Sequence, residues 1–230
     1  MKQGFVKVAS ATPRIRVADP VYNAQVICEQ AKEAAEHGAK IVVFPELCIT
    51  GYTCNDLFLQ ELLLEKAKEA LLTIVEETGQ LEALFLVGLP VDKDGRLYNV
   101  AAVLYRGRIL GMIPKKNIPM YAEFYEGRHF TPGEETVTEY RLGKQEIPFG
   151  TNLLFRCEEL PELILGCELC EDLWVAEPPS TSHALMGATV IANLSASNET
   201  VSKDDYRTRL VKASSARLLC GYIYTSAGEG

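Results

Sequence analysis

Short apolar runs that alternate with helical patterns constrain the fold of this chain most strongly. Residues 4–10 and the run IVVF flank a segment whose apolar residues recur at helical spacing. Asp19-Pro20 is typical of a helix start, the helix should run to about Glu36, and Gly38 stands where a left-handed C-terminal cap is wanted. The pattern predicts a β-α-β unit, and the runs that follow predict an α/β sheet covered by helices.

The same signals predict the later elements. The Arg106-Gly107 pair indicates a tight hairpin turn, and residues 114–150 have no clear period, which favours a functional loop over the site. The remaining predictions, in chain order, are a helix capped by Asp56 and ending near Glu77, strands near 83–89, 97–105, 108–113, 151–156 and 161–167, a helix near 178–187, strand TVIANL, a helix capped by Ser202 with Tyr206, Leu210, Ala213 and Leu218 on one side, and a final strand CGYIYTS.

Size and charge narrow the class of protein. At 230 residues the chain has the length of one large α/β domain, and no second domain is required. With 31 acidic and 23 basic residues the net charge is −8, which argues against nucleic acid or an anionic membrane as the main partner. No apolar stretch approaches the ~20 residues that cross a bilayer, and no secretory signal is present. Together with an odd number of cysteines, seven, this predicts a cytosolic protein.

Three of the strand-like runs end at a reactive side chain. IVVFPE ends at the carboxylate of Glu46, ILGMIPK ends at the amine of Lys115, and LILGCELC ends at the thiol of Cys170. The apolar neighbours of Glu46 would raise its pKa and make it a better base. A buried strand that ends in a thiol beside charged residues indicates a chemical site.

Other interpretations of Cys170 follow from its neighbours. Most buried cysteines only pack, and a cysteine nucleophile usually pairs with histidine, yet nothing marks a dyad beside His129, the one histidine in the long loop. Cys167 and Cys170 form a C-x-x-C pair, which raises zinc or redox chemistry. Because the chain has no second such pair and no C-x-x-H partner, we predict no metal site.

Five motifs together resemble the signature regions of a known superfamily. The motifs FPELCITGY, CNDLF, IPKKNIPMYAEFYEGRHF, GCELCEDLW and ANLSASN are similar, in order and spacing, to those of the nitrilase, or carbon–nitrogen hydrolase, superfamily. Within it, GYTCNDLF, CEDLW and the closing YIYTSAGEG resemble the glutaminase domains of glutamine-dependent NAD synthetases. The resemblance implies an α-β-β-α sandwich in which residues 1–230 form one nitrilase-like domain, apparently truncated at its C-terminal end.

The resemblance also implies roles for individual residues. Glu46 would be the general base, Cys170 the nucleophile and Lys115 the cation that stabilises the oxyanion, with Glu123 orienting Lys115.

For the substrate, the resemblance implies that Tyr121 lines the pocket. Glu171 would pair with the α-amino group, while Ser197 and Lys203 would reach the α-carboxylate. Ser197 is equally suited to capping a helix, and a solvated helix face suits Lys203.

The implied reaction is hydrolysis of the side-chain amide of L-glutamine through a cysteine thioester. The ammonia would pass to a C-terminal synthetase module that amidates nicotinic acid adenine dinucleotide; ATP and Mg are expected only in that module, which lies outside this chain, and the glutaminase domain itself would need no cofactor. Homo-oligomers are expected. Two alternatives are a stand-alone amidase or carbamoyl hydrolase, and a non-catalytic scaffold subunit.

Overall fold

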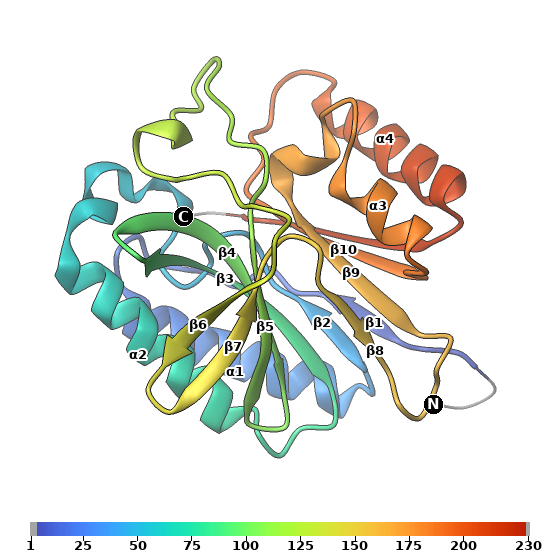
Figure 1. Cartoon of the computed structure of the whole chain (residues 1–230), viewed down its shortest axis with the longest axis horizontal. Helices are drawn as coiled ribbons and strands as arrows, with labels where there is room; N and C mark the ends of the chain where they lie inside the picture. Colours follow the sequence, from blue (N-terminus) through green and yellow to red (C-terminus); the bar gives the residue numbers. More distant parts are fainter. Residues whose placement is uncertain (1–3, 229–230) are drawn as a thin grey trace.

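The computed structural model describes residues 4–228, which form two β-sheets stacked between two pairs of helices (Figure 1). In chain order the elements are β1 (Val8–Ser10), α1 (Pro20–Glu36), β2 (Ile41–Val43), the 3-10 segment η1 (Tyr52–Leu59), α2 (Glu61–Glu77), β3 (Leu84–Lys93), β4 (Arg96–Tyr105), β5 (Arg108–Pro114), η2 (Glu126–Arg128), β6 (Thr138–Leu142), β7 (Gln145–Phe149), β8 (Leu154–Arg156), β9 (Ile164–Leu169), η3 (Cys170–Leu173), α3 (Pro179–Leu185), β10 (Val190–Ser195), α4 (Lys203–Leu218) and β11 (Gly221–Ser226).

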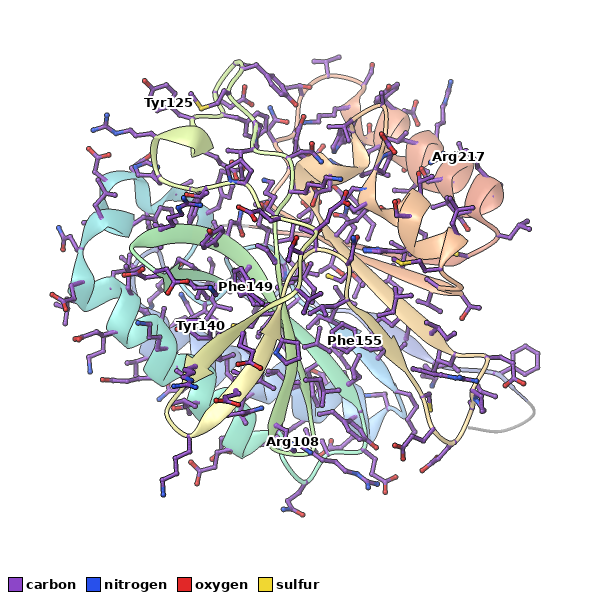
Figure 2. The ribbon with its side chains drawn as sticks, viewed as in Figure 1. Arg108, Tyr125, Tyr140, Phe149, Phe155 and Arg217 are labelled. Atoms are coloured by element: carbon purple, nitrogen blue, oxygen red, sulfur yellow. The ribbon has the colours of Figure 1, made fainter. Side chains whose placement is uncertain are left out.

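The larger sheet has the strand order β1-β2-β3-β4-β5-β7-β6. Its first three strands are parallel, and β3, β4 and β5 follow as an antiparallel meander. The turn between β4 and β5 is the predicted one, because Arg106 and Gly107 both have positive φ, at 46° and 72°. At the other edge, Tyr140 of β6 and Phe149 of β7 pack as neighbouring rings (Figure 2).

The smaller sheet has the order β11-β10-β9-β8, in which β9, β10 and β11 are parallel. Both sheets alternate their side chains between two cores, as pleated strands require. In β4, Val100 and Ala102 face α1 and α2, while Ala101 and Val103 face the core between the sheets. Helices α3 and α4 cover the outer side of the smaller sheet (Figure 1). The predicted α-β-β-α sandwich is confirmed.

The first helix follows from its local sequence. Asp19 caps α1 by accepting a hydrogen bond from the backbone N–H of Tyr22 at 3.1 Å, and Pro20 occupies the first helical position. Gly38 adopts a φ of 82° directly after the helix end, as the left-handed cap requires.

Four predictions were wrong. Asp56 does not cap α2, which begins at Glu61; Asp56 instead lies in η1 and pairs with Arg128 at 2.7 Å. Ser202 precedes α4 but has a left-handed φ of 67° and makes no side-chain cap bond. The side of α4 predicted to carry Tyr206, Leu210, Ala213 and Leu218 does not form a buried face, since Tyr206 is exposed and Ser214 is the one buried residue of α4. Residues 114–150 contain the hairpin β6–β7 as well as a loop.

Within residues 4–228, no helix combines the length and the apolar character needed to span a bilayer. The final two residues of the closing motif YIYTSAGEG lie outside the described residues.

Candidate active site

Glu46 lies just beyond β2, in a turn that packs against the neighbouring strand β3. Its side chain is fully buried, and Leu47 after it has a φ of 51°, an uncommon conformation for a leucine. Gly88 of β3 packs directly against the backbone of this turn. A Cβ atom at Gly88 would lie only 2.3 Å from the Leu47 backbone nitrogen. The close approach of the two backbones therefore fixes the position of Glu46 relative to the sheet.

Lys115 follows the last residue of β5, and its side chain is completely buried. Its Nζ donates to Glu46 Oε1 at 2.7 Å and to Glu126 Oε1 at 2.6 Å. An ammonium has three N–H donors, so these two bonds leave one donor for a further acceptor. We call Glu46, Lys115 and Glu126 the charge cluster; with two carboxylates and one ammonium it has a formal charge of −1.

Glu126, and not Glu123, is the second carboxylate on Lys115, so the contact expected of Glu123 was assigned to the wrong residue. Glu126 begins η2 and is buried, whereas Glu123 is exposed and makes no bond to Lys115. The Tyr52 hydroxyl of η1 also donates to Glu126 Oε1, at 2.7 Å. The turn that forms η2 therefore directs the later of the two glutamates of the EFYE run inward.

Cys170 begins η3 at the end of β9, with a φ of 40° that places a non-glycine residue in the left-handed region. The carboxylate of Asp172 holds this corner: it accepts from the backbone N–H groups of Leu169 at 3.0 Å and Asn117 at 2.8 Å. The Asn117 side chain donates to the same carboxylate at 2.8 Å. Asp172 therefore ties the turn of Cys170 to the segment that follows Lys115.

Burial and charge set the protonation states in this region. Burial, together with the negative charge of Glu46, raises the pKa of the Cys170 thiol to about 12, although Lys115 and the N–H of Ala196 oppose the rise. The pKa of Glu46 is likewise raised, because the effect of burial exceeds the opposing effect of the positive charge on Lys115. Burial by itself would lower the pKa of Lys115, but the negative charges of Glu46 and Glu126 outweigh burial, and the pKa of Lys115 is raised. Cys170 therefore rests as a thiol and needs a base to become a nucleophile.

The backbone of Ala196 connects Glu46 to the second sheet. Its N–H, just beyond β10, donates to Glu46 Oε2 at 2.9 Å, and the same N–H stabilises the Cys170 thiolate. Glu46, Lys115 and Cys170, which lie 124 positions apart at the extremes (170 − 46), therefore meet where β2, β5 and β9 end. Figure 1 shows these strand ends converging beneath the loop that follows β5.

A cavity of about 610 Å³ opens beside the charge cluster. It is large enough for a small organic ligand. Residues of η1, of the loop after β5 and of the segment after β10 line it, among them Tyr52, Phe124, Glu126, Ala196 and Ser197. Glu123 lines it as well.

Of the remaining predicted substrate residues, Tyr121, Glu171 and Lys203 are not part of the cavity lining. The Tyr121 hydroxyl donates to Glu171 Oε2 at 2.8 Å, and burial, together with this bond, raises the pKa of Tyr121 to about 12. Lys203 donates to Asn198 Oδ1, and its ammonium lies 5.2 Å from the ring centre of Trp174 and 5.6 Å from that of Phe124. Neighbouring Tyr125 is largely exposed and, with Glu123, lines the cavity.

Residues 7–225 match the carbon-nitrogen hydrolase family. The chain belongs to this family. Over 229 residues it is 42% identical to glutamine-dependent NAD(+) synthetase from Mycobacterium tuberculosis, an alignment that covers 100% of this chain and 34% of that protein. The corresponding protein of Thermotoga maritima is 33% identical over 204 residues, which are 88% of this chain and 32% of its own length. The chain thus spans about a third of the length of these curated relatives.

Two solved structures resemble the fold of this chain. A glutamine-dependent NAD(+) synthetase from Cytophaga hutchinsonii has a TM-score of 0.85 at 29% identity, covering 95% of this chain and 35% of that one. An amidase of the nitrilase superfamily from Nesterenkonia has a TM-score of 0.74 at 19% identity, covering 98% of this chain and 78% of that one. The second likeness concerns the fold alone.

Sequence reasoning missed four side chains at this hydrolase site: Tyr52, Asn99, Glu126 and Asp172. Tyr52, Glu126 and Asp172 lie within the motifs quoted above, so a signal existed for all three, but nothing local distinguishes Glu126 from Glu123. Asn99 lies in β4, outside those motifs, and only its contacts with Glu46 and Glu126, at least 27 positions away, indicate what it does.

Proposed function

We propose that this chain is a glutaminase domain that hydrolyses the side-chain amide of L-glutamine through a thioester on Cys170. The observation that supports it best is the buried charge cluster beside Cys170, in which Glu46 can accept a proton and Lys115 retains a donor. The choice of glutamine rests on the 42% identity to a glutamine-dependent relative.

The first half of the reaction forms the thioester. Glu46 takes the proton from the Cys170 thiol as sulfur attacks the amide carbon, and the carbonyl electron pair moves onto oxygen. The free N–H of Lys115 and the backbone N–H of Glu171 hold this oxyanion. The intermediate collapses when the C–N bond breaks and Glu46 returns the proton to the departing nitrogen, which leaves as ammonia.

The second half regenerates the enzyme. Glu46 removes a proton from water as the water oxygen attacks the thioester carbon. Collapse of this second intermediate breaks the C–S bond, releases glutamate and leaves the Cys170 thiolate, which regains its proton from Glu46. The high pKa of the Cys170 thiol makes this thiolate a strong base, so reprotonation by Glu46 is favourable.

The substrate's charged end would lie near Phe124 of the cavity lining, whose ring neighbours both Tyr121 and Lys203. The Glu171 carboxylate would accept a hydrogen bond from the α-amino group of the substrate. The hydrogen bond that Tyr121 donates to Glu171 would hold this carboxylate in position. Ser197, which lines the cavity, and Lys203 would bind the α-carboxylate. Lys203 would then exchange its bond to Asn198 for one to the substrate.

We further propose that the ammonia serves a synthetase module of a longer polypeptide, as the names of the relatives suggest. ATP and Mg would bind in that module, and the hydrolase half needs neither. Residues 1–230 as one domain, homo-oligomerisation and a cytosolic location stay predictions.

The test measures ammonia and glutamate release from L-glutamine by the parent chain and by Cys170→Ala. Intact mass is taken after brief exposure to a glutamine-like electrophile, and peptide mapping locates the adduct. Glutamine turnover that the parent shows and Cys170→Ala lacks, together with a single adduct on Cys170 of the parent, would support the proposed glutaminase activity. An adduct without turnover would favour another amide or carbamoyl substrate, or a need for the synthetase module, while neither signal in folded protein would favour the scaffold subunit.

A further inference from the structure

Asn99 of β4 is a buried polar residue in contact with both carboxylates of the charge cluster. Its side chain is fully buried, and its Nδ2 lies 2.7 Å from Glu46 Oε1 and 3.5 Å from Glu126 Oε2. Its backbone carbonyl accepts a hydrogen bond from the N–H of Lys115 at 2.8 Å. One residue therefore contacts all three members of the cluster, from the strand next to β5.

The orientation of the Asn99 amide follows from charge. Reversing the amide would direct its oxygen at two carboxylates, so the NH₂ group must face them. In the described part of the chain the opposite atom, Asn99 Oδ1, is buried and has no hydrogen-bond partner. Leaving a buried acceptor unpaired is costly, so the contacts of the NH₂ group must be worth more than this loss.

The cluster needs such a donor because its charges do not balance. Two carboxylates share one ammonium, and both Lys115 bonds end on Oε1 atoms. Glu46 Oε2 is satisfied by Ala196, whereas Glu126 Oε2 is contacted only by Asn99 among the described side chains. Charge-assisted hydrogen bonds to a buried carboxylate stabilise its ionised form.

We propose that Asn99 is a positioning residue that keeps Glu46 ionised and directed toward Cys170, so that it can accept the thiol proton. It acts through Glu46 and Glu126 and does not touch the substrate. The inference deepens the proposed function, since it concerns the base of that same site. It holds for any amide substrate, because it depends only on proton transfer from Cys170 to Glu46.

The experiment compares the parent with Asn99→Leu, which is similar in size but has no donor, and with Asn99→Asp, which keeps the shape and decides the question if the leucine variant does not fold. Thr78→Val is the matched control: Thr78 is buried at the end of α2, outside the charge cluster, and donates to the carbonyl of Ile74 at 2.7 Å. The main readout is the rate of iodoacetamide alkylation at Cys170 against pH, located by peptide mass. Glutamine turnover against pH is the second readout.

Without the Asn99 donors Glu46 should protonate at higher pH. The acid limb of the alkylation profile should then move up by about 1–2 pH units in Asn99→Leu, and kcat/KM on that limb should fall ~10- to 150-fold, as the loss of one hydrogen bond to a charged group predicts. KM should change little, and Asn99→Asp should show at least as large a shift. Thr78→Val should keep the parent's profile.

An acid limb unchanged in both Asn99 variants, or shifted equally in Thr78→Val, would overturn the inference. Alkylation does not require glutamine, so it separates the two proposals. If the parent fails to hydrolyse glutamine but the Asn99 variants still shift the profile, the proposed substrate fails and the role of Asn99 stands.

Discussion

Glu126 and Glu123 allow a sharp test of the site, because they lie three positions apart in one loop and only Glu126 contacts Lys115. Glu126→Gln keeps the shape of the side chain but removes its charge. Glu126 Oε1 accepts one bond from Lys115 at 2.6 Å and one from Tyr52 at 2.7 Å. A hydrogen bond to a charged group contributes about 1.5–3 kcal/mol. If that stabilisation is lost from the transition state, kcat/KM should fall about 10- to 150-fold.

The pH dependence gives this prediction a sign as well as a size. The charge of Glu126 raises the pKa of Glu46, so removing it lowers the pKa of Glu46. The acid limb of kcat/KM should therefore move to lower pH in Glu126→Gln, opposite to the shift expected for Asn99→Leu.

The assay is kcat/KM for glutamine against pH, with denaturant unfolding to separate activity from stability. Glu123→Gln is the control; Glu123 lines the cavity but is exposed and does not contact Lys115, so any effect should fall on KM, and kcat should stay within about twofold of the parent. Equal losses in the two variants would refute the assignment of Glu126, and so would an acid limb that moves to higher pH in Glu126→Gln.

Three further predictions concern the framework of the site. Gly88→Ala should abolish turnover and lower the free energy of unfolding by ~1–3 kcal/mol, because the added Cβ would lie 2.6 Å from the backbone oxygen of Pro45. Gly221→Ala is the control and should change neither property, because its Cβ would have no neighbour closer than 3.7 Å. Lys115→Ala should reduce kcat about 100- to 1,000-fold in steady-state kinetics, the loss typical of one oxyanion donor, and turnover near the parent's would exclude that role. Burial raises the pKa of Asp172 from 3.8 to about 6. The native state therefore binds the carboxyl proton of Asp172 more tightly than the unfolded chain does, and the protein loses stability as the pH rises from 3.8 through about 6. Relative to Asp172→Asn, the parent should therefore lose up to ~3 kcal/mol of unfolding free energy between pH 4 and 7, from roughly 2 pH units at 1.4 kcal/mol each, and parallel curves in urea titrations would contradict this.

Much of the fold could be predicted because its signals are local. The Asp19-Pro20 start and the Gly38 cap define α1 within a few residues at each end. Where a local signal competes with a distant partner, prediction failed: Asp56 has a residue type suited to capping, yet it pairs with Arg128, 72 positions away.

Local sequence explains why β2, β5 and β9 lead to Glu46, Lys115 and Cys170, since each side chain directly follows an apolar run that must be buried. The groups that surround these three side chains, in contrast, depend on the tertiary structure. The choice of Glu126 over Glu123 depends on a turn of the loop after β5, and the contact of Asn99 with Glu46 joins residues 53 positions apart. The physical reason is that burial of an apolar run is a property of neighbouring residues, whereas pairing of buried charges depends on which backbones the two sheets bring together.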